Sequence, residues 1–211
     1  MINNNISFGK KIPLINCQIQ DKTTGNFIPA TLSEYDCKDE QDILEIVFTG
    51  KQWYFSEAII KNMGKKFKLN KLFEENPLLK KTKFRKEPKS KDEYEKRFFV
   101  MQLEDGRTVG ICQGQNKDSS LKLDYLESQN INYRFIGTTI LASLGIKTLQ
   151  EGNNSITIDS GTTESEDFYT DKCGFKHYTD DTFKLDKKHI KKLIKQTQKE
   201  TQSPIVDLQV W

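Results

Sequence analysis

The segment NINYRFIGTTILASLGIKTL, residues 130–149, carries the pattern from which the fold is inferred. Its apolar residues recur at the spacing of one helical face: Ile140, Leu141, Leu144 and Ile146. Gly137 stands at the start of that pattern, directly before two threonines. A glycine at a helix start lets the backbone approach a ligand closely, and the unpaired N–H groups there attract an anion. The segment therefore predicts a helix whose start depends on backbone groups more than on side chains.

The composition indicates a soluble globular protein. The chain has 211 residues, of which 35% are hydrophobic and 30% charged, and its 13 Phe, 7 Tyr and 2 Trp exceed what a disordered chain normally carries. No apolar run approaches the roughly 18 residues of a membrane span, and the first residues lack the apolar region of a secretory signal. We therefore expect no transmembrane segment and a cytoplasmic location; a bacterial protein exported to act on host proteins is the alternative.

Charge is distributed unevenly along the chain. Residues 61–97 hold 14 Lys and Arg against 6 Asp and Glu, although the whole chain has a net charge of only +3. Two interpretations of this basic segment stay open, a solvated connection or a docking surface for an anionic partner such as nucleic acid.

The four cysteines favour neither a metal site nor a disulfide framework. The cysteines are Cys17, Cys37, Cys112 and Cys173, which are widely separated and form no C-x-x-C pair. The chain has only two histidines that could complete a metal site with them. We expect reduced thiols, some of them buried, and no metal.

Periodicity and turn residues predict the order of elements along the chain. Asp105-Gly106 lies between two β-rich runs and is typical of a tight hairpin turn. Asp186 is a potential N-cap for a basic amphipathic helix that follows it. We expect strands within 11–27, 26–36, 97–104, 107–115, 120–128, 154–161, 175–186 and 203–211, and helices at 39–48, 53–63, 130–149, 163–173 and 186–200.

A second motif, DFYTDKCGF at residues 167–175, lies downstream of Gly137. In this motif, in the glycine at the helix start and in the order of elements, the chain resembles the GNAT superfamily of acyl-CoA-dependent N-acyltransferases. The family signature F-Y-x-x-x-G-F is similar to this motif, but it has three residues between the aromatic pair and the glycine where this chain has four. The resemblance implies an α/β (α+β) fold with a mixed, mostly antiparallel sheet flanked by helices. It assigns residues 27–186 to the acyltransferase domain, with an insertion at 61–97, between an N-terminal extension 1–26 and a basic helix and strand at 187–211.

In the family, a Q/R-x-x-G-x-G/A loop holds the pyrophosphate of the acyl-CoA. Two registers are possible: Arg134-x-x-Gly137-x-Thr139, or Asn132-x-x-Phe135-x-Gly137, which retains the family's apolar rhythm after Gly137. We prefer the second register, although it places a phenylalanine where glycine is usual.

The resemblance implies acetyl-CoA, or a longer acyl-CoA, as co-substrate and an amine as acceptor, and it assigns roles to individual residues. The phosphate loop comprises Asn132, Arg134, Phe135, Ile136, Gly137, Thr138 and Thr139. The strand end that pairs with the pantetheine arm comprises Leu126, Glu127 and Ser128. Tyr169 corresponds to the phenol that protonates the departing thiolate, and the general base is expected among Glu127, Asp124 and Asp159.

The predicted function is transfer of an acetyl or longer acyl group to an amine, which the basic segments suggest is carried by a protein. The alternative is a GNAT-like module without turnover that docks an anionic macromolecule, either nucleic acid or a partner protein.

Overall fold

The computed structural model describes residues 11–35, 42, 45, 96–128, 132–159, 163–179 and 182–207. One compact unit consists of residues 13–33 and 98–211, and a second consists of residues 1–12 and 34–97. Of the helix predicted at 39–48, Asp42 and Glu45 are described and are helical. The helix predicted at 53–63 and the basic segment up to residue 95 lie outside the described residues.

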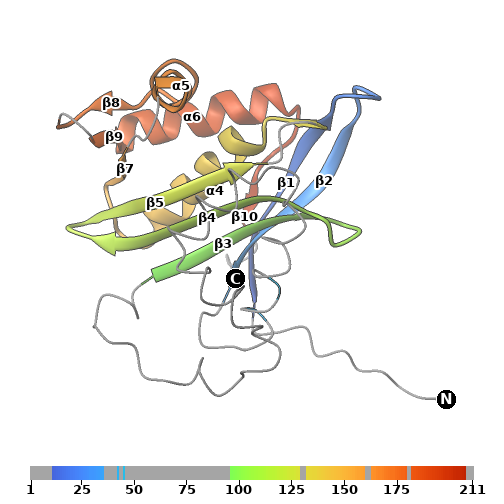
Figure 1. Ribbon diagram of the computed structural model, residues 1–211, viewed down its shortest axis with the longest axis horizontal. Coiled ribbons are helices and arrows are strands. Elements are labelled where there is room, and N and C mark those ends of the chain that lie inside the picture. Colours follow the sequence, from blue (N-terminus) through green and yellow to red (C-terminus); the bar gives the residue numbers. More distant parts are fainter. Residues whose placement is uncertain are drawn as a thin grey trace. The chain divides into compact units, whose positions relative to one another are not determined.

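The described strands form a mixed, mostly antiparallel sheet in the order β10-β1-β2-β3-β4-β5-β7-β9-β8, and β6 pairs with β1 outside this path (Figure 1). The pair β5·β7 is parallel, whereas β4·β5, β7·β9 and β8·β9 are antiparallel. The predicted architecture of a mixed, mostly antiparallel sheet flanked by helices is confirmed. The strands are β1 (Ile12–Asp21), β2 (Phe27–Tyr35), β3 (Lys96–Leu103), β4 (Thr108–Lys117), β5 (Ser120–Ser128), β6 (Tyr133–Arg134), β7 (Ser155–Asp159), β8 (Lys176–His177), β9 (Thr182–Asp186) and β10 (Val206–Asp207).

The predicted hairpin turn at Asp105-Gly106 is confirmed. The Leu103 N–H donates to the Arg107 carbonyl at 2.9 Å, and the Asp105 carboxylate accepts the Arg107 N–H at 3.0 Å. The Asp105 side chain, in place of a backbone carbonyl, accepts the Arg107 N–H and so stabilises the tight turn between β3 and β4.

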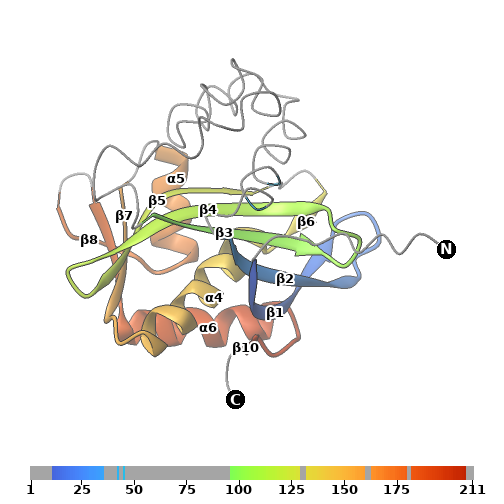
Figure 2. The same cartoon turned by 90° about the horizontal axis from the view of Figure 1, so that it is seen from below.

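The long helices are α4 (Ile136–Gln150) and α6 (Lys187–Glu200). They lie side by side beneath the strands in Figure 2. Gly145 of α4 packs against Ile190 of α6. The Asp186 carboxylate accepts the His189 N–H at 2.9 Å, so the predicted N-cap is confirmed. The helix predicted at 130–149 starts later than expected, at Ile136, because Tyr133 and Arg134 pair with β1 as strand β6.

The helix predicted at 163–173 has two parts. It begins as α5 (Thr163–Asp167) and continues as a π-helix, η3 (Phe168–Lys172), in which the turns are wider than in an α-helix. Gly174, which follows with φ of 76°, ends it as predicted.

The core lies between the sheet and the two long helices. It contains apolar residues from strands at both ends of the sheet, including Leu14, Ile19, Phe99, Leu123, Ile156, Phe183, Ile140 and Leu193. Cys17, Cys112 and Cys173 are buried free thiols, as expected of them, and Cys37 lies outside the described residues. None of the described helices is long and apolar enough to cross a membrane.

The terminal segments supply strands of the same sheet. β1 lies between β2 and β10, although residues 1–26 were assigned to an N-terminal extension. The boundaries 27–186 and 187–211 remain predictions about how the chain divides, while the sheet itself extends across them.

Candidate functional site

A β-bulge in β5 marks the centre of the site. Gln113 of β4 lies opposite Tyr125 and Gly114 lies opposite Leu123, so Asp124 is the additional residue on β5. A bulge bends its strand and redirects the side chains around it, and bulges are common beside active sites. The sequence carries a sign of it, because the apolar residues change phase from Leu121 and Leu123 to Leu126.

β5 and β7 stop pairing at the bulge. Their parallel ladder runs from Ser120↔Ser155 to Leu123↔Ile158, whereas β5 continues to Ser128. The predicted pantetheine segment, Leu126 to Ser128, lies half-buried on this continuing part of β5. A strand that extends beyond its neighbour in the middle of a sheet creates a position where an extended ligand can lie.

The start of α4 has the properties of a phosphate cradle. The first intrahelical bond is donated by the Thr139 N–H to the Phe135 carbonyl at 2.9 Å. The N–H groups of Ile136, Gly137 and Thr138 precede that bond and therefore have no acceptor within the helix. No acidic residue lies in the first turn, so the positive end of the helix dipole is not compensated there. Thr139, a predicted cofactor residue, instead has its N–H inside the helix and its side chain buried.

Phe135 adopts a left-handed backbone conformation with φ of 68° and ψ of 6°. This conformation is unfavourable for residues with a Cβ and natural for glycine. It occurs at the position where the preferred register, Asn132-x-x-Phe135-x-Gly137, expects a glycine. The backbone of this loop thus agrees with that register even though the side chain departs from it.

Gly137 joins the phosphate loop to the second motif. A Cβ at Gly137 would lie 2.8 Å from Cζ of Phe168, the first residue of η3. The two motifs are 31 residues apart in the sequence and meet here, because only a residue without a side chain leaves room for the phenyl ring. The glycine thereby brings the cradle and the aromatic pair into contact.

The loop before α4 is held by the N-terminal hairpin, a relationship that the sequence did not reveal. Gln20 and Asp21 of β1 pair with Arg134 and Tyr133 of β6, and the Lys22 N–H donates to the Asn132 carbonyl at 2.9 Å. Asn132 and Arg134 are exposed, so their side chains are available to a ligand. More than 100 residues separate the paired strands, and a two-residue strand carries no periodic signal.

The π-helix accommodates the extra residue of the second motif. The Cys173 N–H donates to the Phe168 carbonyl at 3.2 Å, five residues earlier, and the Phe175 N–H donates to the Tyr169 carbonyl at 2.9 Å. A π-turn contains one more residue than an α-turn and often occurs at functional sites. The longer spacing between the aromatic pair and Gly174 is therefore absorbed within the helix.

Tyr169 lies in an apolar environment between two other aromatic rings. Its ring centroid is 5.3 Å from that of Phe168 and 5.5 Å from that of Phe175, and the side chain is only 6% exposed. Burial raises the pKa of the Tyr169 hydroxyl, with smaller contributions from Cys112, Cys173 and Glu127. The phenol therefore remains protonated throughout the neutral range.

The three candidate bases differ in their surroundings. Asp159 is already engaged, because it forms a 2.8 Å ion pair with Lys122 and accepts from the Thr182 hydroxyl at 2.9 Å. Asp124 and Glu127 are half-buried on β5. The charge of Glu127 acts on Tyr169, and that of Asp124 acts on the thiol of Cys112, whose pKa is raised mainly by burial.

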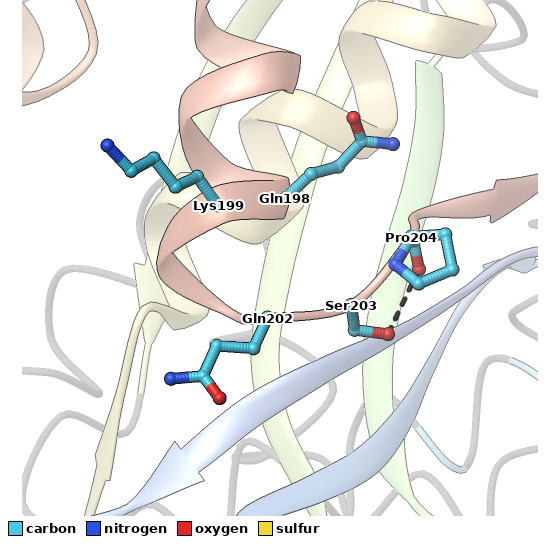
Figure 3. A pocket seen from close by; sticks show the side chains of 5 residues that line it. All are labelled: Gln198, Lys199, Gln202, Ser203 and Pro204. Carbon is cyan, nitrogen blue, oxygen red and sulfur yellow. Dashed lines mark hydrogen bonds between the residues drawn. The ribbon is translucent and has the colours of Figure 1, made fainter.

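A separate hollow occurs at the C-terminal end of α6. Figure 3 shows it lined by the side chains of Gln198, Lys199, Gln202, Ser203 and Pro204, all polar except the proline. The Ser203 hydroxyl donates to the Pro204 carbonyl at 3.2 Å. None of the predicted site residues lines it.

Solved structures similar to this chain are acetyltransferases. A GNAT-family acetyltransferase from Desulfovibrio desulfuricans, described as putative in its name, is 11% identical with a TM-score of 0.47, covering 74% of this chain and 98% of its own. PaiA N-acetyltransferase from Thermoplasma acidophilum, solved with coenzyme A, is 17% identical with a TM-score of 0.45, covering 72% and 96%. A Bacillus subtilis acetyltransferase in complex with CoA is 16% identical with a TM-score of 0.38, covering 45% and 80%. No protein-family model matches the chain, and no curated protein matches it.

Proposed function

We propose that the protein is a GNAT-type N-acyltransferase that transfers an acetyl or longer acyl group from acyl-CoA to an amine. The observation that carries the proposal is the convergence of three features at one place. These are the end of the β5·β7 ladder at the bulge, the N–H groups that open α4, and the buried phenol of Tyr169. A Cβ at Gly137 of α4 would lie 2.8 Å from Phe168, the neighbour of Tyr169, and the charge of Glu127 on β5 contributes to the raised pKa of Tyr169.

The acyl-CoA occupies the site from its pyrophosphate to its thioester. The N–H groups of Ile136, Gly137 and Thr138 bind the pyrophosphate, and Arg134 adds a positive charge from β6. The pantetheine arm runs along Leu126 to Ser128, where β5 continues past the end of its ladder with β7. This course carries the thioester toward the bulge.

The reaction is a direct transfer without a covalent enzyme intermediate. The amine nitrogen attacks the thioester carbonyl carbon, a C–N bond forms and the C–S bond breaks. The leaving sulfur receives a proton from the Tyr169 hydroxyl, and the proton lost by the amine goes to Glu127 or Asp124. Return of that proton through water to the tyrosinate restores the enzyme.

The environment of Tyr169 suits this role. Burial raises its pKa, so the proton is present at the start of the reaction. The departing thiolate forms in the same apolar surroundings, which destabilise it and increase its demand for a proton. A phenol is a weak acid, but holding the hydroxyl next to the sulfur increases the rate of proton transfer.

Calorimetric titration with acetyl-CoA tests the proposal, with acetyl-pantetheine as the matched ligand. Both carry the same thioester, but acetyl-pantetheine lacks the pyrophosphate. We expect one acetyl-CoA per chain and at least tenfold weaker binding of acetyl-pantetheine. Absence of acetyl-CoA binding at high micromolar concentration excludes the acyltransferase, and equal affinity for both ligands excludes the cradle at α4.

A release assay for free coenzyme A with lysine-containing peptides separates an enzyme from a binding module. Amine-dependent release supports turnover. Tight acetyl-CoA binding without release for any amine favours the alternative, a GNAT-like module that binds the cofactor and docks to another macromolecule.

A further inference from the structure

The outer face of α6 is strongly basic. All its lysines are exposed, and they fall within about 140° of the helix circumference at 100° per residue: Lys187, Lys188, Lys191, Lys192, Lys195 and Lys199. We call this set the α6 lysine face. The opposite side of the helix carries Ile190, Leu193 and Thr197, which are buried.

The lysine face is not neutralised by ion pairs, although the Asp186 carboxylate caps the helix beside its first two lysines. Among the described residues, none of its six side chains forms an ion pair. Four pairs lie at the i,i+4 spacing at which like charges repel: 187/191, 188/192, 191/195 and 195/199. Lys187 and Lys188 also stand in the first turn, next to the positive end of the helix dipole. Repulsion between these lysines therefore destabilises the helix, and an anionic partner would remove that repulsion.

The geometry distinguishes between kinds of anionic partner. A helix that inserts into a membrane surface uses its apolar face. In α6 that face is already covered, because Ile190 and Leu193 are buried and Gly145 of α4 packs against Ile190. The helix therefore offers a membrane charge alone. It offers a linear polyanion a row of cations about 18 Å long, from the twelve steps of 1.5 Å between Lys187 and Lys199.

From this arrangement we propose that the α6 lysine face binds the phosphate backbone of nucleic acid. A duplex presents one charge per about 1.7 Å of its axis, which supplies a continuous row of partners for lysines spaced about 6 Å apart. Contacts to phosphate carry no sequence information, so binding through this row of lysines is independent of sequence. The proposal concerns a surface separate from the acyl-CoA site and does not depend on acyl transfer.

Two triple variants with the same change of charge test the proposal. Lys191, Lys195 and Lys199→Gln neutralises three members of the face, and glutamine has nearly the helix propensity of lysine. Lys117, Lys172 and Lys176→Gln neutralises three exposed lysines elsewhere. Circular dichroism and thermal unfolding establish that both variants fold.

Fluorescence anisotropy with a labelled 20-base-pair duplex gives the affinity of each protein between 50 and 200 mM salt. We expect the α6 variant to lower the slope of log K against log salt by about 3, because each phosphate contact contributes roughly 0.9. The slope of the control variant should equal that of the unaltered chain.

Three results would overturn the proposal. The first is no binding of the duplex at 50 mM salt, and the second is an equal loss in both variants, which means that net charge alone acts. The third is lysine-dependent binding of vesicles containing anionic phospholipid without binding of the duplex, which identifies the face as a membrane-docking surface.

Discussion

Gly137 and Phe168 meet across the candidate site: a Cβ at Gly137 would lie 2.8 Å from the phenyl Cζ of Phe168. This contact places the opening of α4 directly against the π-helix that carries Tyr169. The proposed cofactor cradle and the proposed acid thus depend on each other, because the absence of a side chain at Gly137 makes room for Phe168.

Gly137→Ala should therefore weaken acetyl-CoA binding as well as stability. Overpacking of this kind typically destabilises a protein by about 1–3 kcal/mol. Gly145→Ala is the matched control, because Gly145 lies further along the same helix, α4, and its Cβ would lie 2.8 Å from Ile190 of α6. Thermal unfolding should show a loss in both variants, while calorimetry should show weaker binding only for Gly137→Ala. Equal affinities would contradict the role of this contact in the site.

Phe135→Gly should be more stable than Phe135→Ala, which is the reverse of the usual order for these two residues. Both remove the ring, but only glycine relieves the left-handed backbone, which costs other residues about 1–2 kcal/mol. Glycine is normally less stable than alanine within a regular element by roughly 0.5–1 kcal/mol. We expect chemical denaturation to show that Phe135→Gly is the more stable variant. The ordinary order, with alanine more stable, would refute strain at this residue.

Tyr169→Phe should slow chemistry without weakening cofactor binding. The packing against Phe168 and Phe175 involves the ring, which phenylalanine retains. Loss of a general acid typically reduces the rate by about 10²–10⁴-fold. Single-turnover measurements should show this loss at unchanged acetyl-CoA affinity, and an unchanged rate would remove Tyr169 from the mechanism. Because burial raises the pKa of Tyr169, the rate of the unaltered enzyme should not fall through loss of this proton below about pH 10, the ordinary tyrosine value.

Lys22→Pro should loosen the phosphate loop from the N-terminal hairpin. The substitution removes the N–H that donates to Asn132, whereas Lys22→Ala removes only the side chain. One net hydrogen bond is worth about 0.5–1.5 kcal/mol, so acetyl-CoA affinity should fall about two- to tenfold in the proline variant. Alanine should have a smaller effect. If alanine weakens binding as much as proline, the lysine charge and not the backbone bond supports the site.

The stability of the fold should decline at alkaline pH through its buried thiols. Burial raises the pKa of Cys17 from 9.0 to about 12. Above pH 9 the unfolded chain releases this proton and the folded chain retains it, so the free energy of unfolding decreases as pH rises to about 12. The contribution approaches about 1.4 kcal/mol per pH unit for one thiol. Urea denaturation of the unaltered chain and of Cys17→Ala should diverge between pH 9 and 11; parallel curves would show that this thiol ionises equally in both states.

Local sequence patterns sufficed for much of the fold. The Asp105-Gly106 turn, the cap at Asp186 and the stop at Gly174 each depend on interactions within a few residues, which the sequence displays directly. The sequence predicts the start of this helix too early, because Tyr133 and Arg134 pair with β1, a strand distant in the sequence, and α4 begins only at Ile136. Tertiary pairing overrides local preference there.

The sequence by itself determined the two motifs, the order of most elements and the chemical types at the proposed site. Only the tertiary structure decided which of these residues meet. It showed that Phe135 takes a glycine-like conformation, that η3 absorbs the extra residue before Gly174, and that β1 supports the phosphate loop. The physical reason is that propensity and capping act over a few residues, whereas strand pairing and close packing join residues whose separation in the chain leaves no periodic trace.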